Sequence, residues 1–151
     1  MRLEPVNTTD AAELVAGELR GRAAAPGWPH RDTAPGLSFA AMGGSSFLII
    51  DDDERIAGEC GTKRPPDRHG MVEIGYGLAA PSRGQRLGSR AVAALVEQIS
   101  QWPPVRVIEA EVHVSNTPSR RVVEGLGFAV VSGPDDGFLR YRRSADQTSQ
   151  L

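Results

Sequence analysis

The segment 82–88 carries residue types that suit the binding of an anion. It joins a strand-like stretch to a helix-like one, where free backbone N–H groups and the positive end of a helix dipole come together. Gly84 and Gly88 let a ligand approach the backbone, and nearby arginines add positive charge suited to phosphates: Arg83, Arg86 and Arg90. On spacing alone, a helix start beside a solvated arginine face explains the same residues, so phosphate binding is one of two interpretations.

Two familiar nucleotide-binding motifs do not fit this loop. A P-loop needs Gly-Lys followed by Ser or Thr after a longer loop, and the sequence has none. A dinucleotide-binding fold needs three spaced glycines and an acidic residue about 20 positions later. The order Gly84-Gln85-Arg86-Leu87-Gly88 does not match that spacing. A pyridine-nucleotide enzyme is therefore disfavoured, and titration with NADH would test it.

A second group of polar residues follows the next predicted strand, in the order Asn116-Thr117-Pro118-Ser119. An Asn at a strand end and a Ser one turn into the following helix both point toward the edge of the sheet where ligands bind in α/β folds. The alternative is a helix cap followed by a Ser that is bonded to its own helix. Neither interpretation is excluded by this segment alone.

Taken together, the two groups resemble the GNAT superfamily of N-acetyltransferases. In that family, Arg/Gln-x-x-Gly-x-Gly/Ala forms the loop that holds the acetyl-coenzyme A pyrophosphate. The likeness is closer to the ribosomal-protein-alanine acetyltransferase branch, which favours Asn-x-x-Ser-x-Arg-Val-Leu-Glu-x-x-Gly-Phe, and it covers roughly residues 56–142. Two positions depart from the family pattern. Arg86 stands where Gly is usual, and Val123 stands where many relatives carry a Tyr proton donor.

The resemblance implies acetyl-coenzyme A as the cofactor, with coenzyme A as the product, and no metal. It implies that the end of the strand before the loop pairs with the pantetheine arm, that Asn116 holds this arm, and that Ser119 faces the leaving sulfur. The cofactor-binding residues so implied are Leu78, Ala79, Ala80, Arg83, Gly84, Gln85, Arg86, Leu87, Gly88, Ser89, Asn116 and Ser119. The acceptor is then a primary amine of a protein N-terminus, a peptide or a small molecule, which attacks directly in a ternary complex.

The acceptor amine decides whether a catalytic base is needed. At neutral pH an α-amino group of pKa about 7.8 loses about 1 kcal/mol to protonation, whereas a lysine of pKa about 10.4 loses more than about 4 kcal/mol. Glu73 is the first candidate for the base, because it shares a strand face with two glycines at the cofactor strand. Glu111 and His113 on the next strand are the alternates, and each of the three could instead be solvated or salt-bridged. The predicted catalytic residues are therefore Glu73, Ser119 and Asn116.

Trp28, His30 and Asp32 lie in an early connection that is rich in Pro and Gly. In the GNAT family this connection lines the acceptor pocket. A surface loop anchored by Trp28 is the alternative.

The elements that must position these residues follow from local patterns. Strands are predicted at residues 2–6, 46–50, 55–63, 71–80, 105–114, 128–131 and 138–141. Helices are predicted from residue 8, with cap chemistry at Thr8 to Asp10, to about 22, at 37–42, from 87 to 102, and after Asn116 or Thr117. This order predicts a mixed α/β sheet of about seven strands with helices on both faces. The resemblance adds the GNAT fold, with a V-shaped splay between the two central parallel strands.

Composition limits the function classes. The domain is expected to span residues 1–143, followed by a polar tail at 144–151 that is expected to be disordered. A net charge of −2 argues against a nucleic-acid partner, and no segment approaches the roughly 20 apolar residues of a membrane span.

The N-terminus lacks the apolar run of a signal peptide, and the single Cys60 suits a reducing cytoplasm. The strand-like surroundings of Cys60 favour packing over a nucleophilic role. We therefore expect a cytoplasmic acetyl-coenzyme A-dependent N-acetyltransferase that acts on an amine-bearing acceptor, with a homodimer as one open assembly. A non-catalytic acyl-coenzyme A sensor is the alternative from another class.

Overall fold

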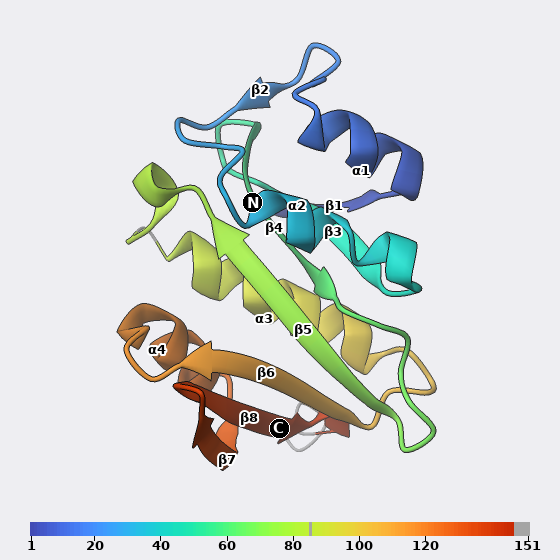
Figure 1. The fold of residues 1–151 in the computed structure, drawn as a ribbon, viewed down its shortest axis with the longest axis vertical. Helices are drawn as coiled ribbons and strands as arrows, with labels where there is room; N and C mark the ends of the chain where they lie inside the picture. The colour runs from blue at the N-terminus through green and yellow to red at the C-terminus, as the bar shows by residue number, and fades with distance from the viewer. Residues whose placement is uncertain (85, 147–151) are drawn as a thin grey trace. The chain divides into compact units, whose positions relative to one another are not determined.

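The computed structural model describes residues 1–84 and 86–146, and the chain divides into two compact units. The first unit comprises Met1–Pro65 and Gly75–Leu95, and the second comprises Pro66–Ile74 and Val96–Leu151. Figure 1 labels the α-helices and the strands. With the two 3₁₀ helices η1 and η2, the elements in chain order are β1 (Arg2–Val6), α1 (Thr8–Val15), β2 (Ala23–Ala24), α2 (Thr33–Leu37), η1 (Ala40–Met42), β3 (Ser45–Ile50), β4 (Arg55–Thr62), β5 (Met71–Leu78), η2 (Ala80–Ser82), α3 (Leu87–Ser100), β6 (Val107–His113), α4 (Thr117–Gly125), β7 (Ala129–Asp135) and β8 (Phe138–Ser144). Gln85 of the predicted loop and residues 147–151 of the predicted tail lie outside the described residues.

The strands are hydrogen-bonded in the order β1-β3-β4-β5-β6-β8-β7, and the two-residue β2 pairs with β4. The sheet therefore has eight strands where about seven were predicted, and the additional one is β2. β5 and β6 pair in parallel, whereas β1 with β3, β3 with β4, β6 with β8 and β7 with β8 are antiparallel. This mixed sheet with helices confirms the predicted fold class.

The parallel ladder between β5 and β6 is short. It pairs Met71 with Val107 at one end and Ile74 with Ala110 at the other. β5 continues to Leu78 in the first unit, and β6 continues to His113 while staying paired with β8 in the second. The parallel ladder thus joins four residue pairs in the first half of each strand.

In the first unit, α1 differs from its prediction at both ends. Asn7 is the N-cap, because its side-chain oxygen accepts a hydrogen bond from the backbone N–H of Asp10 at 2.8 Å. The predicted cap at Thr8 to Asp10 was therefore wrong by one residue. The helix ends at Val15, because Gly17 takes a φ of +92° that stops the helix and that glycine adopts without strain. The predicted extension to residue 22 was wrong for this reason.

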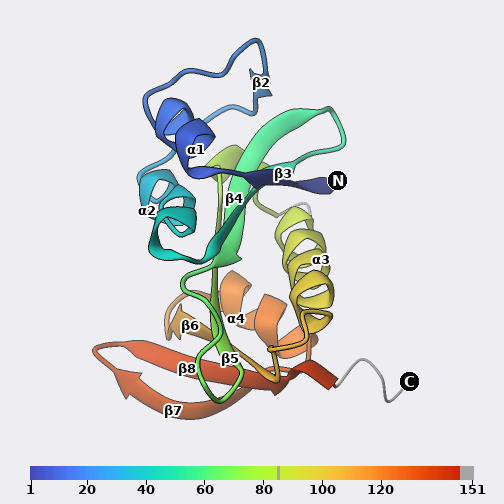
Figure 2. The same cartoon turned by 90° about the vertical axis from the view of Figure 1, so that its right-hand side faces the viewer.

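The rest of the first unit surrounds β3 and β4. Two short helices, α2 and η1, replace the single helix predicted at 37–42. Figure 2 shows α2 and the first half of α3 on opposite sides of β4. A buried apolar cluster joins α1 and α2 to the strands: Val6, Ala11, Leu14, Trp28, Leu37, Leu48, Ile50, Ile56 and Ala79.

In the second unit, β6 and β8 pair from Val107–Ser144 to His113–Phe138. The apolar side of β6 is buried as predicted, and the wholly buried Tyr141 packs in this unit as well. The closing hairpin is longer than the strands predicted at 128–131 and 138–141, because Asp136 and Gly137 both take positive φ and form a tight turn between β7 and β8.

None of the helices formed by the described residues combines the length and the apolar character that a membrane span requires.

Candidate functional site

The predicted phosphate loop lies in the first unit, between the end of β5 and the start of α3. The chain turns at η2, where the N–H of Ser82 donates to the carbonyl of Ala79 at 2.9 Å. Gly84 then takes a φ of +80°. α3 starts at Leu87, so the N–H groups of its first turn have no acceptor one turn earlier in the helix. Donors of this kind at the positive end of a helix bind anions.

Arg86 occupies a strained position in this loop. Its φ of +62° lies in the left-handed region, which costs a residue with a β-carbon about 1–2 kcal/mol. This backbone conformation accounts for the glycine that the family usually has there. The exposed side chains of Arg83 and Arg86 make no ion pair with any residue of the described part of the chain, so both guanidinium groups are open to an anion.

Arg90, the third arginine of the predicted cluster, is held by the protein itself. Its two terminal nitrogens lie 3.0 and 3.2 Å from the two carboxylate oxygens of Asp52. The amino group of Met1 lies 2.5 Å from the same carboxylate. The hydrogen bonds from Arg90 and then from Met1 hold the pKa of Asp52 far below its usual range. The charge of Arg90 is thus neutralised within the first unit, which differs from the phosphate role expected of it.

The glycines of β5 face other side chains of the first unit. A β-carbon at Gly77 would lie 3.0 Å from Glu59 Oε2 and 3.0 Å from His30 Cε1. A β-carbon at Gly75 would lie 3.0 Å from the ring of Phe39. The sequence predicted a close approach to these glycines, and in this structure protein side chains make it.

Glu59 and His30 form a buried pair beside Gly77. The side chain of Glu59, in the middle of β4, is 2% exposed, and that of His30 is 14% exposed. His30 Nε2 lies 3.1 Å from Glu59 Oε2. The other oxygen, Oε1, is buried and has no hydrogen-bond partner among the described residues. Because buried polar atoms are nearly always paired, this oxygen points to a donor supplied by a ligand.

Burial raises the pKa of the Glu59 carboxyl above its ordinary value, since desolvation disfavours the charged form. Thr33 and His30 act in the opposite direction, although the Thr33 hydroxyl makes no hydrogen bond of normal geometry to Oε1. A buried carboxylate with a raised pKa and one open oxygen has the properties of a general base.

The neighbouring Cys60 is inert. Burial strongly raises the pKa of its thiol, and the charge of Glu59 adds to this effect. The side chain is fully buried, which confirms the packing interpretation from the sequence.

Asn116 and Ser119 lie at the start of α4 in the second unit. Asn116 is the N-cap, since its Oδ1 accepts a hydrogen bond from the Ser119 N–H at 3.2 Å. The cap interpretation from the sequence therefore holds for this oxygen, and the Asn116 side-chain amide N–H₂ is still available as a donor on an exposed residue. The roles that the family motif gives to both residues stay predictions.

Glu73, the first candidate for the base, has an arginine beside it in the second unit. Its Oε1 lies 3.8 Å from a terminal nitrogen of Arg140. Arg140 also donates to the buried carboxylate of Glu109 at 2.9 Å, and Arg142 donates to the other oxygen of Glu109 at 2.7 Å. These contacts form an ion-pair cluster on β5, β6 and β8 and leave the catalytic role of Glu73 a prediction.

Glu111 and His113, the two alternative candidates for the base, have different surroundings. Glu111 is exposed on β6. His113 Nδ1 lies 2.7 Å from Ser115 Oγ, and its ring meets that of Phe138 edge-on. Both stay predictions as well.

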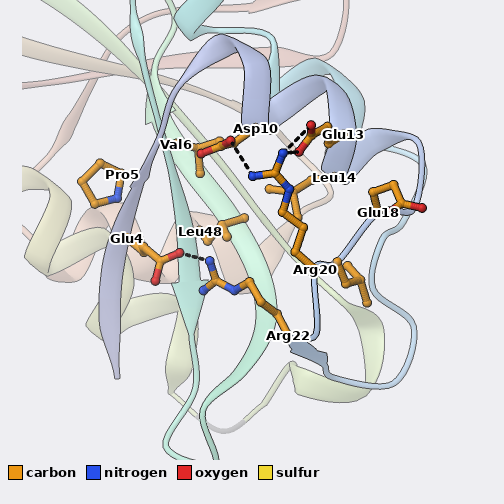
Figure 3. A pocket seen from close by; sticks show the side chains of 11 residues that line it. Glu4, Pro5, Val6, Asp10, Glu13, Leu14, Glu18, Arg20, Arg22 and Leu48 are labelled. Atoms are coloured by element: carbon orange, nitrogen blue, oxygen red, sulfur yellow. Dashed lines mark hydrogen bonds and ion pairs between the residues drawn. The ribbon is translucent and has the colours of Figure 1, made fainter.

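A separate cavity of about 170 Å³ lies beside α1 in the first unit, as Figure 3 shows. Four acidic residues line it: Glu4, Asp10, Glu13 and Glu18. Arg20 pairs with Glu13 at 2.5 Å, and Arg22 pairs with Glu4. The cavity is therefore lined by ion pairs internal to the chain.

Residues 1–129 match the family described as the acetyltransferase (GNAT) domain. The chain belongs to the GNAT acetyltransferase family. The family predicted from the sequence is confirmed, whereas the matches do not single out the ribosomal-protein-alanine branch of the GNAT proteins.

The chain is also similar to individual proteins in sequence and in structure. An uncharacterized N-acetyltransferase, p20 from Bacillus licheniformis, is 29% identical over 92 residues, which cover 61% of this chain and 52% of that protein. The chain thus spans about half the length of this curated relative. Aminoglycoside acetyltransferase AAC(6')-Ib, solved with coenzyme A, gives a TM-score of 0.68 at 20% identity over 99% of this chain and 98% of its own. A dodecameric spermidine N-acetyltransferase from Vibrio cholerae gives a TM-score of 0.68 at 13% identity over 97% and 95%.

The loop of this GNAT chain fits the cofactor that its family uses, acetyl-coenzyme A. The left-handed turn, the helix N-terminus and the two open arginines provide N–H donors and positive charge in the first unit. These are the groups that a pyrophosphate needs.

Glu59 was missed by the reasoning from sequence. It is the only charged residue in the stretch 56–62, which reads as a buried strand. A single carboxylate in a buried strand needs a hydrogen-bond partner, so this pattern in the sequence could have identified Glu59 as a candidate. His30, its partner, was among the residues expected to line the acceptor pocket.

Proposed function

We propose that this GNAT protein transfers an acetyl group from acetyl-coenzyme A to a primary amine, with Glu59 as the general base. The observation that carries the proposal is the open Oε1 of Glu59, buried in the same unit as the cofactor loop. Acetyl-coenzyme A, when bound, supplies an acetyl group activated as a thioester. The chain's own residues have to bind it, orient the amine and remove a proton from that amine.

Binding is assigned to the residues at the end of β5 and in the loop after it. The backbone at Leu78 to Ala80 is proposed to pair with the pantetheine arm. The N–H groups from Arg83 to Ser89 and the side chains of Arg83 and Arg86 are proposed to hold the pyrophosphate.

Proton removal is assigned to Glu59. An ammonium group that donates to Oε1 gives this oxygen the hydrogen bond that it lacks among the described residues. The raised pKa of Glu59 brings the carboxyl closer to the pKa of an amine and makes it a stronger base than an exposed carboxylate. Such a base matters most for an alkyl amine, whose deprotonation at neutral pH costs more than about 4 kcal/mol.

Asn116 and Ser119 keep the roles that the family motif predicts: Asn116 holds the pantetheine arm, and Ser119 faces the leaving sulfur. A thiol has a pKa of about 8.5, so a thiolate leaves readily and Ser119 has little acid catalysis to supply. We therefore expect Ser119→Ala to lower turnover by less than the roughly 10²–10⁴-fold that is typical of acid–base groups, with little dependence on the acceptor.

The acceptor is proposed to be a small alkyl amine. A buried base with a raised pKa supports this class over an α-amine, which needs little help. The solved GNAT structures with similar folds include enzymes named for spermidine and for aminoglycosides, both of which are small molecules that carry amino groups. A protein or peptide N-terminus is the other acceptor that the sequence left open.

The test is a thioester-consumption assay with a panel of a polyamine, an aminoglycoside and a peptide with a free N-terminus. Glu59→Gln is compared with Glu73→Gln, because both remove a carboxylate and keep its shape. We expect Glu59→Gln to lower kcat/KM for the alkyl amine by about 10²–10⁴-fold, with a loss that shrinks as pH rises, and Glu73→Gln to have little effect.

Three outcomes would contradict parts of the proposal. The reverse ranking of the two variants would make Glu73 the base. Full activity of Glu59→Gln with every amine would remove Glu59 from catalysis. Binding of acetyl-coenzyme A without consumption by any amine would make the protein an acyl-coenzyme A binding module.

A further inference from the structure

Both ring nitrogens of His30 are engaged, which fixes where its proton lies. Nδ1 accepts a hydrogen bond from the backbone N–H of Asp32 at 3.2 Å. In a neutral imidazole one nitrogen accepts and the other carries the proton. The proton is therefore on Nε2, which donates to Glu59 Oε2 at 3.1 Å.

The backbone around His30 is held in place by short-range hydrogen bonds. The His30 N–H donates to the Thr33 hydroxyl at 3.0 Å, and the Thr33 N–H donates to the His30 carbonyl at 3.1 Å. Two residues earlier, Trp28 is buried in the apolar cluster of the first unit. The imidazole thus reaches Glu59 from an anchored segment and not from a loose loop.

Glycines make the approach of the two side chains possible. A β-carbon at Gly77 would lie 3.0 Å from both Glu59 Oε2 and His30 Cε1, and one at Gly36 would lie 2.7 Å from Glu59 Cγ. Gly36 of α2 and Gly77 of β5 therefore lie against the pair, and among the described residues His30 makes the hydrogen bond to Oε2.

We propose that His30 is a positioning residue for Glu59: its Nε2–H holds Oε2, keeps the buried carboxylate ionised and leaves Oε1 for the acceptor amine. This inference rests on the proposed function, in which Glu59 is the base. It adds a residue that acts on the base and does not itself touch the reacting atoms.

Few other charges face Glu59. α2 and β3 carry no ionisable side chain, and between Gly75 and Leu78 the only one is Tyr76. On β4 the neighbouring Cys60 stays a neutral thiol, and Lys63 lies just beyond the strand, with its Cε near the Gly75 position. Among the described residues, His30 is the titratable side chain that hydrogen-bonds directly to the Glu59 carboxylate.

The consequence is a pH effect of defined direction. Burial already raises the pKa of Glu59, and both Thr33 and the hydrogen bond donated by His30 oppose that rise. Without the donor the pKa rises further, so the carboxylate that acts as base appears only at higher pH. A hydrogen bond to a charged group shifts an equilibrium by about ten- to a hundredfold, so the acidic limb of kcat/KM should move up by about one to two pH units.

The experiment compares His30→Phe with His30→Gln in the full chain. Phenylalanine fills the space without a donor, whereas the glutamine amide can place an N–H where Nε2 was. We expect His30→Phe to shift the acidic limb upward and to regain wild-type kcat/KM above it, and His30→Gln to restore the original limb. A uniform loss of activity at every pH, or a glutamine variant no better than phenylalanine, would overturn the inference.

Two measurements keep this test separate from folding and from the proposed function. The ¹³C chemical shift of the Glu59 carboxyl, followed against pH, reports its protonation without any turnover. The midpoint of this titration must move to higher pH in His30→Phe. Glu59→Gln serves as the reference for catalysis. If Glu59→Gln keeps full activity, the assignment of Glu59 as the base is wrong. If Glu59→Gln is inactive while His30→Phe leaves the Glu59 titration and the acidic limb of kcat/KM unchanged, only the role of His30 is wrong.

Discussion

Glu59 is a residue whose chemistry depends on its surroundings. In the unfolded chain its carboxyl titrates near the ordinary pKa of about 4.3. In the folded protein the side chain is 2% exposed, and burial raises that pKa. A buried carboxylate that lacks a partner on one oxygen destabilises the fold, and such a cost is kept where function needs it.

The raised pKa of Glu59 predicts how the stability of the protein depends on pH. Because the native state binds the Glu59 proton more tightly than the unfolded chain, the stability that this group contributes is lost as pH rises from the unfolded pKa through the raised native pKa. Glu59→Gln removes the titration. We expect the variant to gain free energy of unfolding relative to the wild type as pH rises from about 4 to about 8. Urea unfolding at several pH values measures this, and a difference that stays constant with pH would contradict it.

Arg86 shows strain at a residue of the cofactor loop. Its φ is +62°, a conformation that glycine adopts without cost. We expect Arg86→Gly to be more stable than Arg86→Ala by about 0.5–1 kcal/mol, because only glycine relieves the backbone strain. Glycine also raises the conformational entropy of the unfolded chain, which offsets part of that gain. Both variants remove the charge and should weaken acetyl-coenzyme A binding equally. Thermal unfolding and a binding titration test the pair, and equal stabilities would show that the strain is negligible.

At the scale of the elements, α4 is fixed to its unit by a polar network. Arg120 Nε donates to the hydroxyl of Tyr141 at 3.1 Å, and this hydroxyl donates to Glu124 at 2.5 Å. Arg120 also donates to the carbonyl of Val114, just after β6, at 3.2 Å. The first turn of α4, which carries Asn116 and Ser119, is therefore held by β8 and by the end of β6.

The two asparagine caps form a matched pair for testing this element. Asn7 caps α1 and Asn116 caps α4, each through its side-chain oxygen. Replacing either by alanine should cost about 1 kcal/mol of stability, because one backbone N–H loses its acceptor. We expect only Asn116→Ala to lower kcat/KM for acetyl-coenzyme A as well. An equal loss of activity in both variants would mean that Asn116 acts through the cap alone.

At the scale of the whole molecule, the chain forms two compact units, and β5 contributes residues to both. The cofactor loop, Glu59 and His30 belong to the first unit, whereas Asn116 and Ser119 belong to the second. A ligand that binds only the folded protein stabilises it by mass action, whichever of these residues it touches.

The cofactor should therefore stabilise the whole chain in a predictable way. Acetyl-coenzyme A at 100 times its Kd should add about 2.7 kcal/mol to the free energy of unfolding. Gly88→Glu is the control, because it places a carboxylate in the first turn of α3, where the pyrophosphate is proposed to bind. We expect this variant to keep its far-ultraviolet circular dichroism and to lose the stabilisation. A full thermal shift in Gly88→Glu would show that the loop is only a helix start.

Much of the fold could be predicted from the sequence, because local patterns determine it. The strands predicted at 71–80 and 105–114 and the helix predicted at 87–102 correspond to β5, β6 and α3. The ends of helix α1 were predicted less well, because a helix cap depends on which side chain reaches the free N–H groups. Asn7, and not its neighbours, caps α1 for this reason. The family motif at 82–88 and 116–128 was also visible, because its glycines and its asparagine are close in the chain.

Only the tertiary structure brings together the two side chains on which we base the proposal that Glu59 is the base. Glu59 and His30 are 29 positions apart and meet only because α2 packs on β4. The pKa of a carboxyl depends on desolvation and on partners far along the chain, neither of which a local pattern contains. The same holds for Arg90, whose charge was expected to face phosphate and which instead pairs with Asp52, 38 positions earlier. The sequence by itself determined the fold class and predicted the loop at 82–88 as an anion site, whereas packing decided that Arg90 pairs with Asp52 while Arg83 and Arg86 make no ion pair among the described residues.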